Sequence, residues 1–149
     1  MNLVSPLPGT VVALTTVSDP VFAQQLVGAG AAVKPARSGE KLTAVAPISG
    51  TIAKLHPHAF VIVGDEGVGV LVHIGIDTVQ LKGEGFALLA AEKTRVNAGD
   101  PVVTFDPEAV VAAGYDDICP VVVLDSKPDT ATVTATEVAA GDPLLTWHP

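Results

Sequence analysis

Two histidines flank a turn-forming segment, and their spacing could bring two imidazole rings to bear on one reacting group. His58 begins the β-prone run 58–63, and His73 ends the apolar run 68–73, with Gly-Asp-Glu-Gly at 64–67 between the runs. Residues at equal distances from a hairpin turn lie opposite each other in an antiparallel pair, so we expect the two rings to be neighbours. Because imidazole titrates near neutral pH, one ring could act as a nucleophile and the other as a hydrogen-bond donor.

The residues after His73 place small and polar groups at the same strand end. Gly75 has no side chain to keep the backbone away from the ring, and Asp77 adds a carboxylate. The run 71–86, LVHIGIDTVQLKGEGF, resembles the phosphorylation-site signature of the glucose-family enzyme IIA of the bacterial phosphoenolpyruvate-dependent sugar phosphotransferase system. The resemblance implies that Nε2 of His73 accepts a phosphoryl group, that the Gly75 carbonyl orients this ring, that His58 stabilises the phosphoryl group, and that Asp77 belongs to the site.

The family resemblance also implies a donor, an acceptor and a docking surface. The expected donor is phospho-HPr, and the expected acceptor is a Cys on the IIB domain of a sugar permease; regulated metabolic or transport proteins are further expected partners. The stretch 20–28 resembles the family's partner-docking segment. Asp19 and Asp77 could meet basic side chains of the donor. If they are exposed, an apolar docking ring would comprise Val21, Phe22, Leu26, Val27, Leu71 and Val79.

One position departs from the family pattern. Members commonly place a Thr two residues before the supporting His and have a slightly longer loop, whereas this chain has His56 there, in Lys-Leu-His-Pro-His at 54–58. The orientation of His58 should therefore depend on another group. The sequence leaves a role for His56 open.

Composition favours a single globular domain over residues 1–149. The hydrophobic fraction is 48% and the charged fraction 16%, which argues against disorder. A net charge of −8 would repel nucleic acid and anionic membranes, so we expect membrane contact only through the permease. The N-terminus shows no signal-peptide core and Cys119 has no partner for an internal disulfide, so we expect a cytoplasmic protein.

The spacing of β-prone runs predicts an all-β, antiparallel sandwich or barrel-like domain with internal pseudo-repeats and a few short helical turns. The segment 6–12 matches 47–53, and 96–105 matches 138–147. A helix is predicted at 107–113, with helical turns at 22–27 and 86–92. The predicted strands are 11–16, 31–35, 42–46, 50–54, 59–63, 68–73, 101–105, 121–124, 131–136 and 143–147.

Three other functions compete with the phosphocarrier. The first is a zinc-dependent hydrolase using His56, His58, His73 and Asp77, but these motifs occur in the reverse of the order found in lysostaphin-type peptidases. The second is a biotin or lipoyl carrier, which the absence of a Met-Lys-Met-like turn disfavours. The third is a non-catalytic regulatory binding module. We expect no required cofactor or metal, although His58 and His73 could bind zinc adventitiously or at a partner interface.

Overall fold

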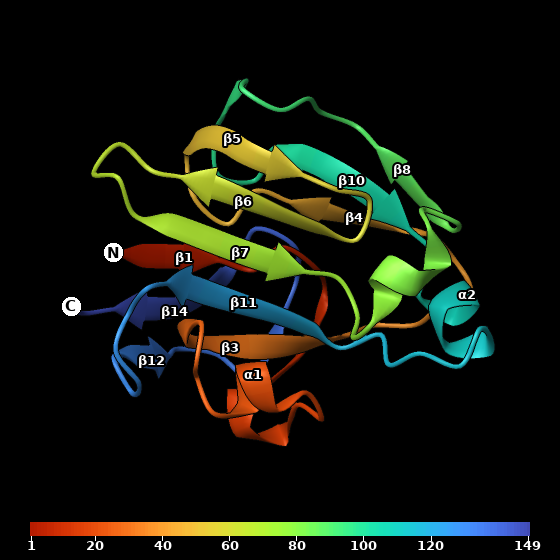
Figure 1. The fold of residues 1–149 in the computed structure, drawn as a ribbon, viewed down its shortest axis with the longest axis horizontal. Helices are drawn as coiled ribbons and strands as arrows, with labels where there is room; N and C mark the ends of the chain where they lie inside the picture. Colours follow the sequence, from red (N-terminus) through yellow and green to blue (C-terminus); the bar gives the residue numbers. More distant parts are fainter.

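The chain folds almost entirely into short antiparallel strands, which confirms the predicted fold class. A computed structural model describes residues 1–149 (Figure 1). Its strands are β1 (Asn2–Val4), β2 (Gly9–Val12), β3 (Gly28–Pro35), β4 (Leu42–Val45), β5 (Gly50–Leu55), β6 (Ala59–Val63), β7 (Gly69–His73), β8 (Phe86–Leu88), β9 (Arg95–Val96), β10 (Pro101–Phe105), β11 (Cys119–Leu124), β12 (Ala131–Val133), β13 (Glu137–Val138) and β14 (Pro143–Trp147). Its helical segments are η1 (Leu14–Thr16), α1 (Pro20–Ala23), η2 (Thr78–Leu81) and α2 (Pro107–Ala112).

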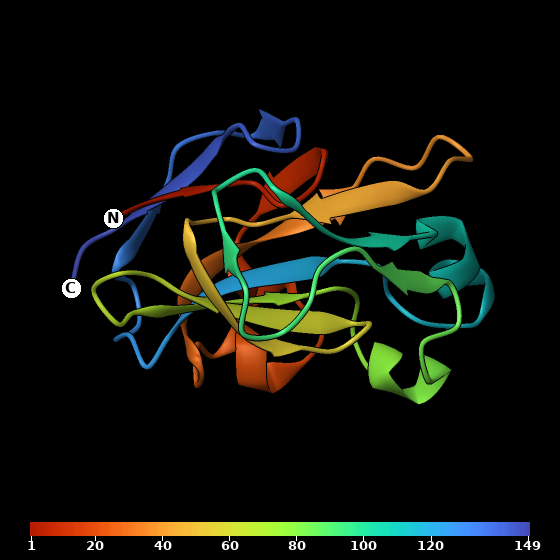
Figure 2. The ribbon, with the colours of Figure 1, turned by 90° about the horizontal axis from the view of Figure 1, so that it is seen from above.

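These strands form one large sheet and two small ones. The large sheet has the order β13-β2-β3-β11-β7-β6-β5-β9, and the small sheets are β1-β14-β12 and β4-β10-β8. The view from above shows the small sheets stacked over one face of the large sheet (Figure 2). A core of 25 buried residues fills the space between them, and a second core of seven residues lies on the other face, beneath η1 and α1. The second core supports the face on which His73 lies, because Leu71 packs against it two residues before His73.

The internal repeats interlock through reciprocal hydrogen bonds. The backbone amide of Val4 donates to the carbonyl of Pro47 at 3.0 Å, and the amide of Val45 donates to the carbonyl of Pro6 at 2.9 Å. The segment preceding each Pro/Gly turn is thus held by the turn of the other copy. The pairing of β2 with β13 is likewise matched by that of β5 with β9. The sequence duplication therefore corresponds to approximate internal symmetry.

Several local expectations fail where tertiary pairing decides the conformation. Residues 86–92 do not form a helical turn, since 86–88 is strand β8 and pairs with β10. Residues 14–16 leave the predicted strand and form η1, in which the Thr16 amide donates to the Ala13 carbonyl. No local sequence signal is strong enough to predict the strands at 2–4, 95–96 and 137–138 or the helical turn η2. Pairing energy, rather than residue propensity, stabilises such short elements.

The two helices begin at capping aspartates. Asp106 accepts hydrogen bonds from the amides of Glu108 and Ala109, and Pro107 occupies the first turn, as predicted for α2. Helix α1 begins earlier than the predicted turn at 22–27, because Asp19 caps it by accepting from the Val21 amide at 2.9 Å. No helix here has the length and apolar character that crossing a membrane requires.

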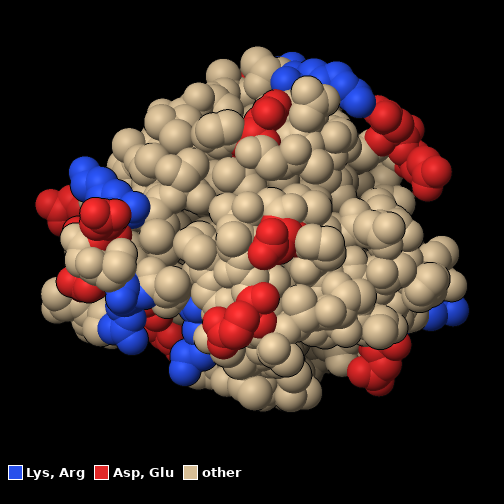
Figure 3. All heavy atoms as spheres, turned by 180° about the vertical axis from the view of Figure 1, so that it is seen from behind, with Lys and Arg blue, Asp and Glu red and all other residues tan.

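The face of the molecule opposite to that of Figure 1 carries few charges for its area. Figure 3 shows acidic side chains spread singly or in small groups over it, with the basic side chains near its rim. The whole chain has 16 acidic and only 8 basic residues. This face therefore offers no continuous basic surface of the kind that binds nucleic acid.

Candidate functional site

His73 lies at the last position of β7, in the middle of the large sheet. Strand β7 pairs with β6 on one side and β11 on the other, and His73 is opposite Ala59. Its Nδ1 lies 2.6 Å from the carbonyl oxygen of Gly75. A carbonyl oxygen can only accept a hydrogen bond, so Nδ1 carries the proton and Nε2 keeps its lone pair. The ring is thereby set in the tautomer that a nucleophile at Nε2 requires.

The Gly75 carbonyl is itself held by close packing. Gly75 has φ = +79°, and a Cβ at this position would lie 2.5 Å from Cγ2 of Thr78 and 2.9 Å from the carbonyl oxygen of Asp116. Buried Thr78 donates through Oγ1 to the carbonyl of Ile74 at 2.6 Å, and the Ile76 amide donates to the Asp116 carbonyl at 2.9 Å. The backbone after His73 is therefore fixed from both sides, and only glycine fits at position 75.

His58 lies beside His73, as the hairpin spacing predicts. The two ring centroids are 5.3 Å apart and the rings cross at 75°, edge to face. The Ile74 amide donates to the His58 carbonyl at 2.7 Å, which extends the ladder one residue beyond Ala59 and His73. His58 is in the turn before β6 rather than in the strand, because Pro57 and His58 form the bend between β5 and β6. Strand β6 therefore begins at Ala59, as the predicted strand 59–63 does.

Phe22 closes another side of the His73 ring. Its ring centroid is 5.3 Å from that of His73, with a tilt of 56°. Phe22 is only 6% exposed, so it does not meet the exposure condition set for the predicted docking ring. Val21, Leu26 and Val79 do meet it, with exposures of 42%, 67% and 55%. The other two members, at positions 27 and 71, are half-buried.

Burial and neighbouring charges shift the pKa of His73 in opposite directions. Burial lowers the pKa of His73 below its ordinary value of 6.5, whereas the Gly75 hydrogen bond and the charges of Asp19 and Asp77 oppose the shift. Burial is also the largest cause that lowers the pKa of His58, and the charges of His73 and His56 lower it further. Both rings are therefore neutral at pH 7, which leaves the lone pair on Nε2 of His73 available. Asp77 is exposed and begins η2 in a left-handed conformation with φ = +60°.

His56 stacks on His58. Their ring centroids are 5.9 Å apart with an angle of 25°, and His56 is exposed. The three histidines therefore follow one another in space in the order His56, His58, His73. Even so, no group of three or more His, Cys, Asp or Glu side chains has a geometry that could hold a metal ion. Cys119 is fully buried in the main core, and burial raises the pKa of its thiol, so it is not a nucleophile.

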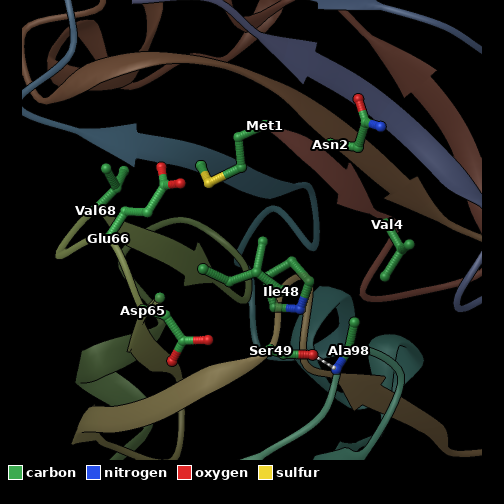
Figure 4. A pocket seen from close by; sticks show the side chains of 11 residues that line it. Met1, Asn2, Val4, Ile48, Ser49, Asp65, Glu66, Val68 and Ala98 are labelled. Carbon is green, nitrogen blue, oxygen red and sulfur yellow. Dashed lines mark hydrogen bonds between the residues drawn. The ribbon is translucent and has the colours of Figure 1, made fainter.

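The largest hollows in the surface lie away from the histidines. Figure 4 shows one of about 480 Å³, at the end of the β6–β7 hairpin opposite to His58 and His73. The carboxylates of Asp65 and Glu66 and the Met1 side chain line it, and the hydroxyl of Ser49 there accepts from the Ala98 amide. None of the predicted site residues lines this hollow.

The family model for the phosphoenolpyruvate-dependent sugar phosphotransferase system, EIIA 1, matches residues 1–128. This chain belongs to that EIIA family. It is 41% identical over 145 residues to the glucose-specific EIIA component of Halalkalibacterium halodurans, a match that covers 95% of this chain and 82% of the relative. It is 50% identical over 110 residues to the glucose-specific EIICBA component of Streptococcus pneumoniae. This match covers 72% of this chain but only 15% of the relative's length.

A solved structure shares the EIIA fold. Glucose permease IIA from Mycoplasma capricolum superimposes with a TM-score of 0.88 at 34% identity, covering 97% of this chain and 94% of that one. As a member of the EIIA family, the protein is a phosphotransferase component with a phosphocarrier role in sugar uptake. Neither the family match nor the site geometry supports a zinc-dependent hydrolase.

Three contacts of the EIIA site were not predicted from the sequence. The packing of Phe22 on His73 joins segments 51 residues apart, and no local pattern indicates which side of the helix faces the ring. The bridge from Ile76 to Asp116 also joins distant segments. Thr78 could have been found, because a Thr four residues after a carbonyl at the start of a helical turn is a common local hydrogen-bond donor.

Proposed function

We propose that Nε2 of His73 accepts a phosphoryl group from phospho-HPr and passes it to a Cys on the IIB domain of a sugar permease, in the cytoplasm. In the first step the lone pair of Nε2 forms a bond to phosphorus as the bond from phosphorus to the donor's histidine breaks. In the second step the bond from Nε2 to phosphorus breaks as a sulfur–phosphorus bond forms. The observation that carries the proposal is the 2.6 Å contact from Nδ1 to the Gly75 carbonyl, which leaves Nε2 unprotonated.

His58 is placed to stabilise the phosphoryl group in transit. Its ring is 5.3 Å from the His73 ring, and no protein group accepts or donates a hydrogen bond to its side chain. A ring nitrogen is therefore free to donate to a phosphoryl oxygen. Charge that develops on the phosphoryl oxygens during transfer is stabilised by donors already in position.

The surface around His73 suits protein partners. The exposed side chains of Val21, Leu26 and Val79 provide apolar area, and Asp19 and Asp77 lie close enough to His73 to raise its pKa against the effect of burial. Basic side chains on the donor would meet these carboxylates. The similarity to EIICBA and EIIBCA permease components, in which the A unit shares a chain with B and C units, supports a IIB acceptor.

The role of His58 is tested by separating the two transfer steps. In His58→Gln, phosphorylation of His73 by phospho-HPr should persist, because the Gln amide can still donate a hydrogen bond. Discharge to IIB should slow by roughly 10²–10³, the usual cost of losing a charge-stabilising group, because an amide cannot carry a positive charge or exchange a proton as an imidazole does. The matched control is His148→Gln, since His148 is exposed near the C-terminus. If His58→Gln discharges as fast as this control, His58 only packs against His73. If His58→Gln blocks phosphorylation while His73→Gln is still phosphorylated, the two roles are reversed.

Zinc is not needed for this mechanism. The His58 and His73 pair supplies two nitrogen ligands at most, and a catalytic zinc ion requires about three protein ligands. Removal of metal by a chelator should therefore leave both transfer rates unchanged, in stopped assays with and without chelator. A chelator-sensitive rate would instead favour a metalloenzyme.

A further inference from the structure

The β5–β6 turn places His56 directly against the side chain that the proposed function assigns to phosphoryl stabilisation. The amide of His56 donates to the Ala59 carbonyl at 2.8 Å, so Pro57 and His58 form a two-residue bend between them. The Pro57 ring fixes the backbone dihedral φ at the first bend position. Gly83, in the loop after η2, lies beside the Pro57 ring, since a Cβ added to Gly83 would be 3.5 Å from Pro57 Cγ, an ordinary van der Waals distance.

The side chain of His58 has no hydrogen bond that fixes its orientation. His73 has its Nδ1 tied to Gly75, but no protein group is bonded to either ring nitrogen of His58. A half-buried imidazole in this condition can rotate about two side-chain bonds, and only packing restricts it. The packing partners are the His73 ring at 5.3 Å, met edge to face, and the His56 ring at 5.9 Å, nearly parallel at 25°. The stacked His56 ring therefore limits rotation of the His58 ring.

We propose that His56 is a positioning residue that holds the His58 ring toward the phosphoryl group on His73 by stacking on the His58 ring. The inference rests on the proposed function, since it assumes that His58 acts on the group in transit. His56 is exposed and does not touch the reacting atoms. The effect of His56 must therefore pass through His58. An aromatic ring without ionisable nitrogens at position 56 should have the same effect.

The test compares His56→Ala with His56→Phe, each in the wild-type and His58→Gln backgrounds. In single-turnover discharge of the phosphorylated protein to IIB, His56→Ala should be roughly two- to tenfold slower than wild type, the effect expected from losing one aromatic pair. His56→Phe should stay within about twofold of wild type, because the stacking surface remains. In the His58→Gln background, His56→Ala should cause no further loss, since the ring that it positions is absent.

Three results of the discharge assay overturn the proposal. The first is a His56→Ala protein that discharges at the wild-type rate. The second is a His56→Ala effect that persists undiminished in the His58→Gln background, because His56 would then act independently of His58. Equal losses in His56→Ala and His56→Phe would likewise reject stacking as the mechanism.

A second readout needs no phosphorylation and separates this inference from the proposed function. In the unphosphorylated protein, nuclear Overhauser contacts between the His58 and His73 rings should be strong in wild type and His56→Phe and weaker in His56→Ala. Because His56 is exposed, all three proteins should unfold at similar temperatures. If wild type is not phosphorylated at all, the proposed function fails, yet the ring contacts still decide whether His56 positions His58. Unchanged ring contacts in His56→Ala would reject the positioning role.

Discussion

The glycine after the strand end gives a sharp prediction, because position 75 combines a left-handed backbone with close neighbours. In Gly75→Ala the new Cβ would lie 2.5 Å from Thr78 Cγ2 and 2.9 Å from the Asp116 carbonyl oxygen, both well inside ordinary contact distance. The left-handed φ of +79° alone costs a non-glycine residue about 1–2 kcal/mol, and overpacking adds about 1–3 kcal/mol. We therefore expect Gly75→Ala to lower the free energy of unfolding by about 2–5 kcal/mol.

A matched control separates backbone strain from crowding. Gly67, in the turn at the other end of the same hairpin, has φ = +82°, and a Cβ added there would have no atom within 4 Å. Gly67→Ala should therefore cost only the backbone term of about 1–2 kcal/mol. Urea unfolding of both variants and wild type gives the difference between the two terms.

The functional consequence of Gly75→Ala follows from the hydrogen bond to His73. Relief of the contacts must displace the Gly75 carbonyl, which lies 2.6 Å from Nδ1 of His73. Loss of a hydrogen bond worth about 1 kcal/mol would reduce the rate of phosphorylation about fivefold and would let the Nε2-protonated tautomer appear. Rapid-quench phosphorylation by phospho-HPr measures the rate, and long-range ¹H–¹⁵N spectra show the tautomer. A folded Gly75→Ala protein with wild-type tautomer and rate would refute the role given to this carbonyl.

Two further predictions concern buried charge. Burial lowers the pKa values of His73 and His58 in the folded state, so the contribution of these residues to stability is present above pH 6.5 and is lost as the pH falls through the folded-state pKa. Between pH 7 and pH 5, wild type should therefore lose more stability than His73→Gln. Equal losses in urea unfolding would contradict this. The Asp117 side chain is 9% exposed and lies 3.4 Å from Arg37 Nε, so Arg37→Ala leaves a buried carboxylate unpaired and should cost about 1–3 kcal/mol at pH 7. Burial raises the pKa of Asp117, so this cost should become smaller as the pH falls and the carboxyl takes up a proton. The control Lys41→Ala removes a cation that has no ion-pair partner, and a loss as large as that of Arg37→Ala at pH 7 would reject the pairing argument.

The sequence predicted the parts of the fold that local patterns encode. The strands 59–63, 101–105 and 143–147 are predicted to the residue, because each is a compact β-prone run between Gly or Pro turns. Strand β8 was missed, since Phe86–Leu88 has no β signal apart from the pairing that β10 provides. Residue type alone indicates helix or strand weakly in so short a segment, and the neighbouring strand then decides.

The site was predictable to the extent that hairpin geometry determines it. Equal spacing from one turn places His58 beside His73, and the structure confirms this with ring centroids 5.3 Å apart. The burial of Phe22 and the bridge from Ile76 to Asp116 depend on contacts between distant segments, which spacing does not encode. The stacking of His56 on His58 was equally inaccessible, since it requires the bend at Pro57 to turn both rings the same way.

The central claim is that Nε2 of His73 carries the phosphoryl group, and one measurement tests it directly. The protein is incubated with phosphoenolpyruvate, enzyme I and HPr, and the product is analysed by intact-mass spectrometry and ³¹P–¹H correlation spectra. We predict one acid-labile phosphoryl group, bonded to Nε2 of His73, that is absent from His73→Ala and present in His148→Ala. A phosphoryl group on any other atom, or its survival in His73→Ala at the wild-type level, would contradict the account.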